Sequence, residues 1–251
     1  MKTSLWKSGA PVLLLASALL AGCAAPPVFQ QLKEQKAQRV RLVVESNPFA
    51  YAPPASGEAV GGGVPGVMLF TALVAVAIQG QLDSVNTALA TAANTQGVHT
   101  DHRQAFTDEV VRQFKARGVE VELVPLPYAI HSLGGDRAWA KPEDKDLAAL
   151  PKDAPAFWLR TDFGSCTIKV IVPCVRYVMQ PVNAAAAAGA NAPRYRGAAG
   201  TRAGKKEEGT VVFESLDAAT THIQDFDAQF PALIPRAVSS LAVALEGENR
   251  R

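Results

Sequence analysis

Three cysteines and four histidines have the widest chemical scope in this sequence, because a thiolate or an imidazole can act as a nucleophile or a metal ligand. Cys166 and Cys174 lie near each other in the chain. Along a straight strand, the steps between them would separate their Cα atoms by about 26 Å, whereas a disulfide needs roughly 7 Å or less. A bond would therefore require the chain to reverse direction, whereas two free thiols would fit one long strand.

The third cysteine, Cys23, follows a segment with the parts of an export signal. Lys2 and Lys7 give a positive start, an apolar run covers residues 11–20, and small residues follow it. The run has about half of the ~20 residues that a permanent membrane-spanning helix needs. Residues 1–22 are therefore predicted to be a signal peptide.

The end of this signal, Leu20-Ala21-Gly22-Cys23, resembles the lipobox of bacterial prolipoproteins. The resemblance implies that the Cys23 thiol takes a diacylglycerol and the new amino terminus a further acyl chain, which together would hold the protein on a membrane. Ala24 stands where an aspartate would retain the protein in the inner membrane. We therefore expect a lipoprotein of the outer membrane that faces the periplasm; an ordinary secretory signal, cleaved elsewhere, is the alternative.

The expected compartment favours a disulfide between Cys166 and Cys174, because the periplasm is oxidising. We predict a hairpin with strands over residues 157–165 and 175–180 and a loop at 167–173 that the bond closes. The apolar residues of the loop would form an exposed tip, and such patches commonly bind partners. These predicted contact residues are Ile168, Val170, Ile171 and Val172.

The sequence indicates no metal, no cofactor and no catalytic residue. His99 and His102 flank Asp101, but Asp101 is more simply explained as the N-cap of a following helix, beside solvent-exposed imidazoles. His131 and His222 stand apart. The chain also lacks the Gly-x-Ser-x-Gly and His-Glu-x-x-His signatures and the Cys-x-x-Cys spacing of a redox pair.

The other charged groups are interpreted as surface. Arg160 and Asp162 would share a strand face with Trp158 in an exposed neighbourhood. The basic residues between 194 and 206 could touch lipid headgroups or peptidoglycan, but a solvated loop explains them. Loss of Lys2 and Lys7 with the signal leaves 25 − 2 = 23 basic residues, equal to the 23 acidic ones. This balance argues against nucleic-acid binding.

The elements that must position these residues alternate between strands and helices. Residues 23–38 are expected to form a lipidated tether, and loops at 128–154 and 183–208 are expected to be mobile. The predicted elements are strands at 40–45, 119–124 and 210–214 and helices at 101–117 and Phe230–Leu245. Pro125 and Pro127 are expected to end the second strand.

An uncharged stretch at 67–78 follows a glycine-rich segment and is apolar on every helical face. As a helix over 64–78 it would be shorter than the ~30 Å hydrocarbon core of a bilayer. We therefore expect a buried hairpin or an oligomer contact rather than a second membrane anchor.

This order predicts an α/β fold over residues 39–246, a single sandwich of helices on a small mixed sheet with an apolar glycine-rich helical insert. In layout, residues 40–245 resemble the periplasmic α/β domains of the curli-secretion lipoprotein family and of the Tol–Pal β-propeller protein. The insert resembles that of uncharacterised proteobacterial envelope lipoproteins. These resemblances imply a role in envelope assembly.

We expect a non-catalytic binding or assembly module of the cell envelope, held on the membrane by its lipid anchor. Its partner would be a periplasmic protein or another copy of the chain. An enzyme acting on cell-wall or lipid substrates and an oligomeric structural or pore component are the alternatives.

Overall fold

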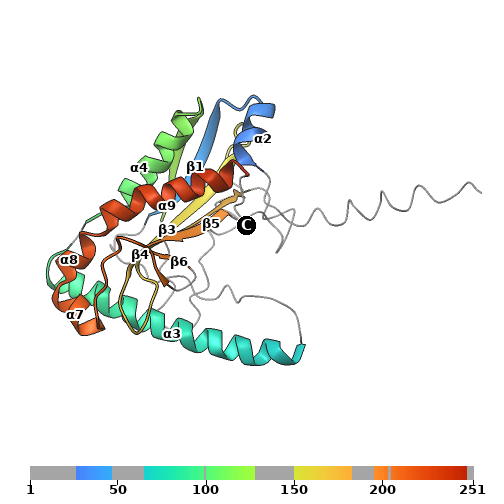
Figure 1. The fold of residues 1–251 in the computed structure, drawn as a ribbon. Helices are drawn as coiled ribbons and strands as arrows, with labels where there is room; N and C mark the ends of the chain where they lie inside the picture. Colours follow the sequence, from blue (N-terminus) through green and yellow to red (C-terminus); the bar gives the residue numbers. More distant parts are fainter. Residues whose placement is uncertain are drawn as a thin grey trace, which may run out of the picture.

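The computed structural model describes residues 27–46, 65–98, 100–127, 150–182, 195–202 and 205–247. Its centre is a five-stranded sheet in the order β2-β1-β3-β4-β5 (Figure 1). The strands are β1 (Arg39–Ser46), β2 (Glu120–Pro127), β3 (Ala156–Ser165), β4 (Pro173–Pro181) and β5 (Tyr195–Ala199). β1 is parallel to β2 and β3, whereas β4 is antiparallel to β3 and β5. The predicted α/β fold with a mixed sheet is confirmed.

Two long helices cover one face of the sheet. α4 (His102–Lys115) contacts β2 and β3, α9 (Phe230–Leu245) contacts β4 and β5, and the two helices contact each other. Both have the predicted positions. Asp101 caps α4 by accepting a hydrogen bond from the Gln104 amide at 3.1 Å. Gly118, with φ 75°, adopts the left-handed conformation in the turn after this helix.

Shorter elements complete the fold around the ends of the sheet. α2 (Val28–Glu34) precedes β1, and α7 (Leu216–Thr221) and α8 (Ile223–Asp227) precede α9. The short strands β6 (Thr201–Arg202) and β7 (Lys205–Lys206) form a separate ladder.

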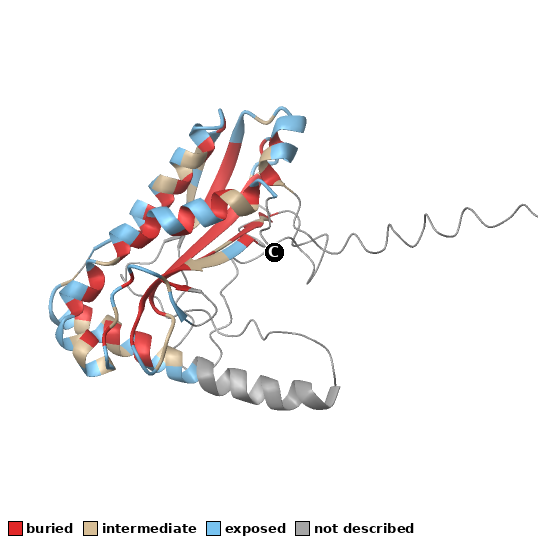
Figure 2. Cartoon of the chain, in the orientation of Figure 1, coloured by how far each residue is buried: buried red, intermediate tan, exposed pale blue. Residues whose placement is uncertain are grey.

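The main core lies between the sheet and the helices, and β3 is buried along its whole length (Figure 2). Phe106 and Phe114 of α4 belong to this core together with Leu159 and Phe163 of β3. Burial also raises the pKa of Tyr195, on β5, to about 12. A second, smaller cluster on the other face of the sheet includes Trp158. β3 is therefore the central strand of two cores.

The segment Ile223–Leu245 is long and apolar enough to cross a membrane by length and composition, and it is the one such segment in the part of the chain that the structure describes. Its Leu233, Ala237 and Leu241 are buried in the core of the domain. Packing within the domain therefore explains its apolar character.

The predicted tether is wrong beyond residue 27, because α2 is docked on the domain. Val28 and Leu32 are 2% and 3% exposed and belong to the main core. Their four-residue spacing places them on one face of the helix, which buries them together. Two apolar residues among many polar ones are a weak sequence signal.

The predicted mobile loop at 183–208 is also wrong in its second half. Residues 195–199 form β5, and its two ends, Tyr195 and Ala199, are buried. Residues 183–194 lie outside the described residues, as do residues 128–149 of the other predicted loop. The strand expected at 210–214 is reduced to one antiparallel bridge between Phe213 and Ile171.

β2 continues through the prolines that were expected to end it. It pairs with β1 as far as Pro127, which lies across from Ser46. The Glu120 amide donates to the Gln38 carbonyl at 2.8 Å, so the even-numbered amides face β1. Pro125 and Pro127 occupy odd positions, where β1 needs no N–H donor.

The uncharged stretch at 67–78 belongs to α3 (Pro65–Thr95), a single helix of 31 residues. The predicted hairpin is therefore wrong, whereas the side chains that would form an oligomer contact lie outside the described residues. The second half of α3 contacts α7, α8 and β3 and buries Leu89 and Asn86.

Candidate functional site

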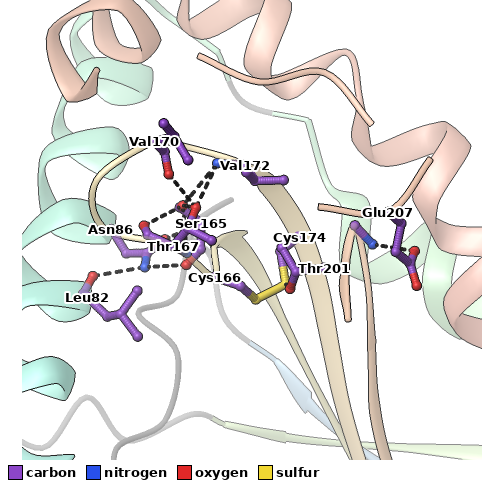
Figure 3. The surroundings of a disulfide bond; sticks show 11 residues. Leu82, Asn86, Ser165, Cys166, Thr167, Val170, Val172, Cys174, Thr201 and Glu207 are labelled. Atoms are coloured by element: carbon purple, nitrogen blue, oxygen red, sulfur yellow. Dashed lines mark hydrogen bonds between the residues drawn. A yellow bond between two sulfur atoms is a disulfide. The ribbon is translucent and has the colours of Figure 1, made fainter. Parts of the chain in front are cut away.

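The disulfide forms as predicted and closes the β3–β4 hairpin (Figure 3). The Cα atoms of Cys166 and Cys174 are 5.7 Å apart. The ladder brings them together, because Gly164 lies opposite Cys174 and Ser165 opposite Pro173. We call residues 165–174 the disulfide loop.

Ser165 and Thr167 organise the disulfide loop with their hydroxyl groups (Figure 3). The Ser165 Oγ donates to the Thr167 carbonyl at 2.9 Å and accepts from the Thr167 amide at 3.2 Å. The Val172 amide donates to Thr167 Oγ1 at 3.1 Å. These bonds provide partners for backbone groups outside the β3–β4 ladder, some of them buried, so the loop has a defined shape.

The predicted apolar tip is wrong for two of its four residues. Ile171 and Val172 are 0% and 1% exposed. Ile171 exchanges backbone hydrogen bonds of 2.8 and 2.9 Å with Phe213, whose segment covers this part of the loop. Ile168 is half-buried, and Val170 is 45% exposed. The loop sequence alone could not predict the contact with Phe213, because the two segments are far apart in the chain.

Asn86 of α3 braces the base of the disulfide loop. Its Oδ1 accepts from the Ser165 amide at 2.7 Å, and its Nδ2 donates to the Ser165 carbonyl at 3.0 Å. Both partners are buried, so each bond stands in a poorly solvated place where an unpaired group is costly. A Cβ on Gly164 would lie 2.0 Å from Asn86 Oδ1, so the close approach of helix and hairpin requires glycine there.

We expect Gly164→Ala to lower the free energy of unfolding by about 1–3 kcal/mol, because the added methyl group displaces the Asn86 amide from Ser165. Gly80→Ala in α3 is the matched control. A Cβ there meets nothing within 4 Å, and alanine stabilises a helix interior by about 0.5–1 kcal/mol relative to glycine. Urea unfolding followed by circular dichroism measures both; equal effects of the two substitutions would contradict the bracing role of Asn86.

Arg160 and Asp162 are buried, so their interpretation as an exposed neighbourhood is wrong. Their side chains are 4% and 3% exposed, and Arg160 Nε lies 3.2 Å from Asp162 Oδ1. They lie with Trp158 on the sheet face opposite the main core, and Arg176 lies across from Asp162 in the ladder. Asp162 Oδ2 is buried and has no hydrogen-bond partner among the described residues. This face of the sheet therefore contains a buried ion pair.

A second charged cluster lies near the start of β1 on the same sheet face. Arg41 Nε lies 3.0 Å from a Glu122 carboxylate oxygen, and Arg41 Nη1 lies 2.6 Å from Asp153 Oδ1. The hydrogen bond from Arg41 lowers the pKa of Asp153, and the same bond raises the pKa of Arg41. Arg41 also donates to the Pro151 carbonyl at 2.6 Å, so the cluster ties the 151–155 segment to the sheet.

A groove with a volume of about 390 Å³ lies beside this cluster. It is lined by residues 35–39 and 153–155. The Arg39–Asp153 ion pair, at 2.6 Å, forms part of its wall. The groove therefore presents this ion pair and the exposed Lys36 to solvent.

His102 is buried, although an exposed imidazole was expected beside Asp101. Its Nε2 lies 2.7 Å from Asp227 Oδ1, and the Thr100 hydroxyl donates to Asp227 Oδ2 at 2.8 Å. The Phe230 ring centroid lies 4.9 Å from the imidazole. An imidazole on a carboxylate can act as a general base in an open site, but here the pair joins α4 to α8 inside the core.

The remaining histidines do not extend this pair. His222 is exposed and lies 3.7 Å from Asp225, whereas His99 and His131 lie outside the described residues. Within the described ranges, no three His, Cys, Asp or Glu side chains are grouped closely enough to hold a metal ion.

Comparison of the chain with family models, with curated proteins and with solved structures found no match.

Proposed function

We propose that the chain is an outer-membrane lipoprotein that faces the periplasm and acts as a non-catalytic binding or assembly module of the cell envelope. The observation that carries the proposal is the Cys166–Cys174 disulfide, because such bonds persist in oxidising compartments and are rare in the cytosol. The disulfide agrees with the export and lipidation signal that Leu20-Ala21-Gly22-Cys23 resembles in the sequence.

The buried positions of two charged pairs favour a binding role over a catalytic one. His102 with Asp227, and Arg160 with Asp162, are pairs that an enzyme could use as acids, bases or ligands. Each pair is buried within the domain, where its members contact each other at 2.7 and 3.2 Å. The described pairs therefore support a structural role for these residues.

The disulfide loop is the surface best suited to a partner. Val170 and Val211 are 45% and 42% exposed, and they flank the two segments that the Ile171–Phe213 bridge joins. The loop is held in shape by the disulfide, by its hydroxyl network and by Asn86, so ordering it on binding costs little entropy. A periplasmic protein or a second copy of the chain would use this surface.

The proposed acylation of Cys23 and the membrane location are tested by the mass of the mature protein, extracted with detergent from the membrane fraction. We expect a mass that shows acylated Cys23, and thiols at positions 166 and 174 that are alkylated only after reduction. Cys23→Ala should remain unacylated and keep the disulfide. An unacylated soluble protein with two free thiols would contradict the proposal.

The binding role is tested with a photo-crosslinking residue at Val170 or Val211, activated in intact cells. Leu123 is the matched control, because it is 42% exposed but lies on β2, away from the disulfide loop. We expect a discrete crosslinked species, to another protein or to a second copy, from the two valine positions and not from Leu123. Equal yields at all three positions would count against a specific surface.

A further inference from the structure

The lipid anchor would be joined to the folded domain by a very short segment. α2 begins at Val28, five positions after Cys23. Five residues reach at most about 18 Å when fully extended. A flexible linker of many tens of residues would leave the domain free to turn in any direction. A connection of five residues instead keeps the start of α2 close to the membrane surface.

α2 itself is fixed to the domain, so it cannot act as extra linker. The Phe29 and Phe114 ring centroids are 5.1 Å apart, and the Arg117 guanidinium lies 4.4 Å from the centroid of the Phe29 ring. Pro27 packs against Gly247, where an added Cβ would lie 2.9 Å from the proline Cβ. The chain is therefore held from residue 27 onward.

The elements around α2 form one end of the domain. α2 lies beside the start of β1 and the last turns of α9 in Figure 1. Arg117, after α4, binds Glu246, after α9, with its Nε at 3.1 Å. β3 also begins here, since Ala156 lies opposite Arg41, and it runs to the disulfide loop at its other end. The anchor and the disulfide loop therefore lie at opposite ends of the sheet.

The end near the anchor carries unpaired positive charge. Its acidic residues Glu122, Asp153 and Glu246 are engaged by Arg39, Arg41 and Arg117. Glu34 and Glu120 remain, and Glu34 accepts a hydrogen bond from Gln30. Against these stand four exposed lysines that have no ion-pair partner among the described residues, namely Lys33, Lys36, Lys115 and Lys152.

We propose that this end, which we call the anchor end and define by these four lysines, rests on the anionic headgroups of the leaflet that holds the acyl chains. The proposal rests on the lipid anchor of the proposed function. Lipid insertion and lysine–headgroup attraction are two signals that strengthen each other. The short connection and the fixed α2 impose the orientation, and the disulfide loop then points away from the membrane, toward periplasmic partners.

The test is lysine acetylation of the acylated protein, read by peptide mass spectrometry. The protein is reconstituted into vesicles of phosphatidylethanolamine and phosphatidylglycerol and treated with an amine-reactive acetyl ester. Lys169 and Lys205 are internal controls, because both are exposed and lie on or next to the disulfide loop. We expect acetylation of the four anchor-end lysines to slow several-fold on vesicles relative to detergent, with Lys169 and Lys205 unchanged.

A variant with a longer linker distinguishes a fixed orientation of the domain on the membrane from attachment through the acyl chains alone. A flexible Gly-Ser insertion of about twenty residues after Ala24 frees the domain to move away from the surface, and it should abolish most of the protection. If the anchor-end and control lysines are protected from acetylation equally while Cys23 is acylated in the same spectra, the proposed orientation is wrong but the lipid anchor stands. Absence of acylation would overturn the proposed function with it.

Discussion

Replacing Asp162 by alanine is expected to lower the free energy of unfolding by about 1.5–3 kcal/mol, because it removes a hydrogen bond between two buried charged groups. Arg160 would keep its charge at a position where its side chain is 4% exposed, without the carboxylate 3.2 Å from its Nε. Urea unfolding of the purified protein measures the change. Asp225→Ala is the control, because that carboxylate is 77% exposed and its loss should cost less than about 1 kcal/mol.

The same pair allows a stricter test through a double substitution. Apolar residues of similar volume in place of both members of a buried pair are often neutral or stabilising by about 1–4 kcal/mol. Asp162 Oδ2 already lacks a hydrogen-bond partner among the described residues, which makes the pair costly to bury. Arg160→Met with Asp162→Leu should therefore recover most of the stability that Asp162→Ala loses. A double variant as unstable as the single one would show that the charges stabilise the fold by themselves.

Removal of the disulfide is expected to lower the free energy of unfolding by about 2.5 kcal/mol, from the entropy of closing a loop of 8 residues. The variant Cys166→Ala with Cys174→Ala tests this by urea unfolding under oxidising conditions. The β3–β4 ladder does not depend on the bond, since it runs from Phe157–Pro181 to Ser165–Pro173. We therefore expect a folded protein with faster amide hydrogen exchange in the disulfide loop.

Reduction supplies the matched control for that prediction. Dithiothreitol should destabilise the parent protein by the same amount as the double substitution and leave the substituted protein unchanged. An equal response of both proteins to the reductant would place the effect outside the Cys166–Cys174 bond.

The sequence predicts those elements whose side chains repeat with a clear period. α9 has the predicted bounds, because Leu233, Ala237, Leu241 and Leu245 recur every four residues and all face the core. The hairpin follows from the geometric limit on a disulfide between Cys166 and Cys174. For α9 one local rule is sufficient, whereas the hairpin also needs the expected oxidising compartment to favour the bond.

The sequence fails where the environment of a residue comes from a distant segment. Arg160 and Asp162 look like surface residues because charged side chains are rarely buried, and their pairing is visible only in the folded sheet. His102 looks exposed at the start of a helix, but Asp227, 125 positions later, covers it. Ile171 looks like a loop tip until Phe213 pairs with it. The candidate contact surface is correspondingly smaller than the loop sequence indicates.

The two prolines of β2 also decide how the sheet meets other molecules. A strand with one unpartnered side offers a row of donors and acceptors that can template strand addition and aggregation. In β2 the outward-facing amides are those at odd positions, and proline removes the donor at 125 and at 127. The proposed lipid anchor would concentrate the protein on a membrane surface, where copies meet far more often than in solution. Edge-to-edge polymerisation through this side of the sheet is therefore disfavoured by the backbone itself.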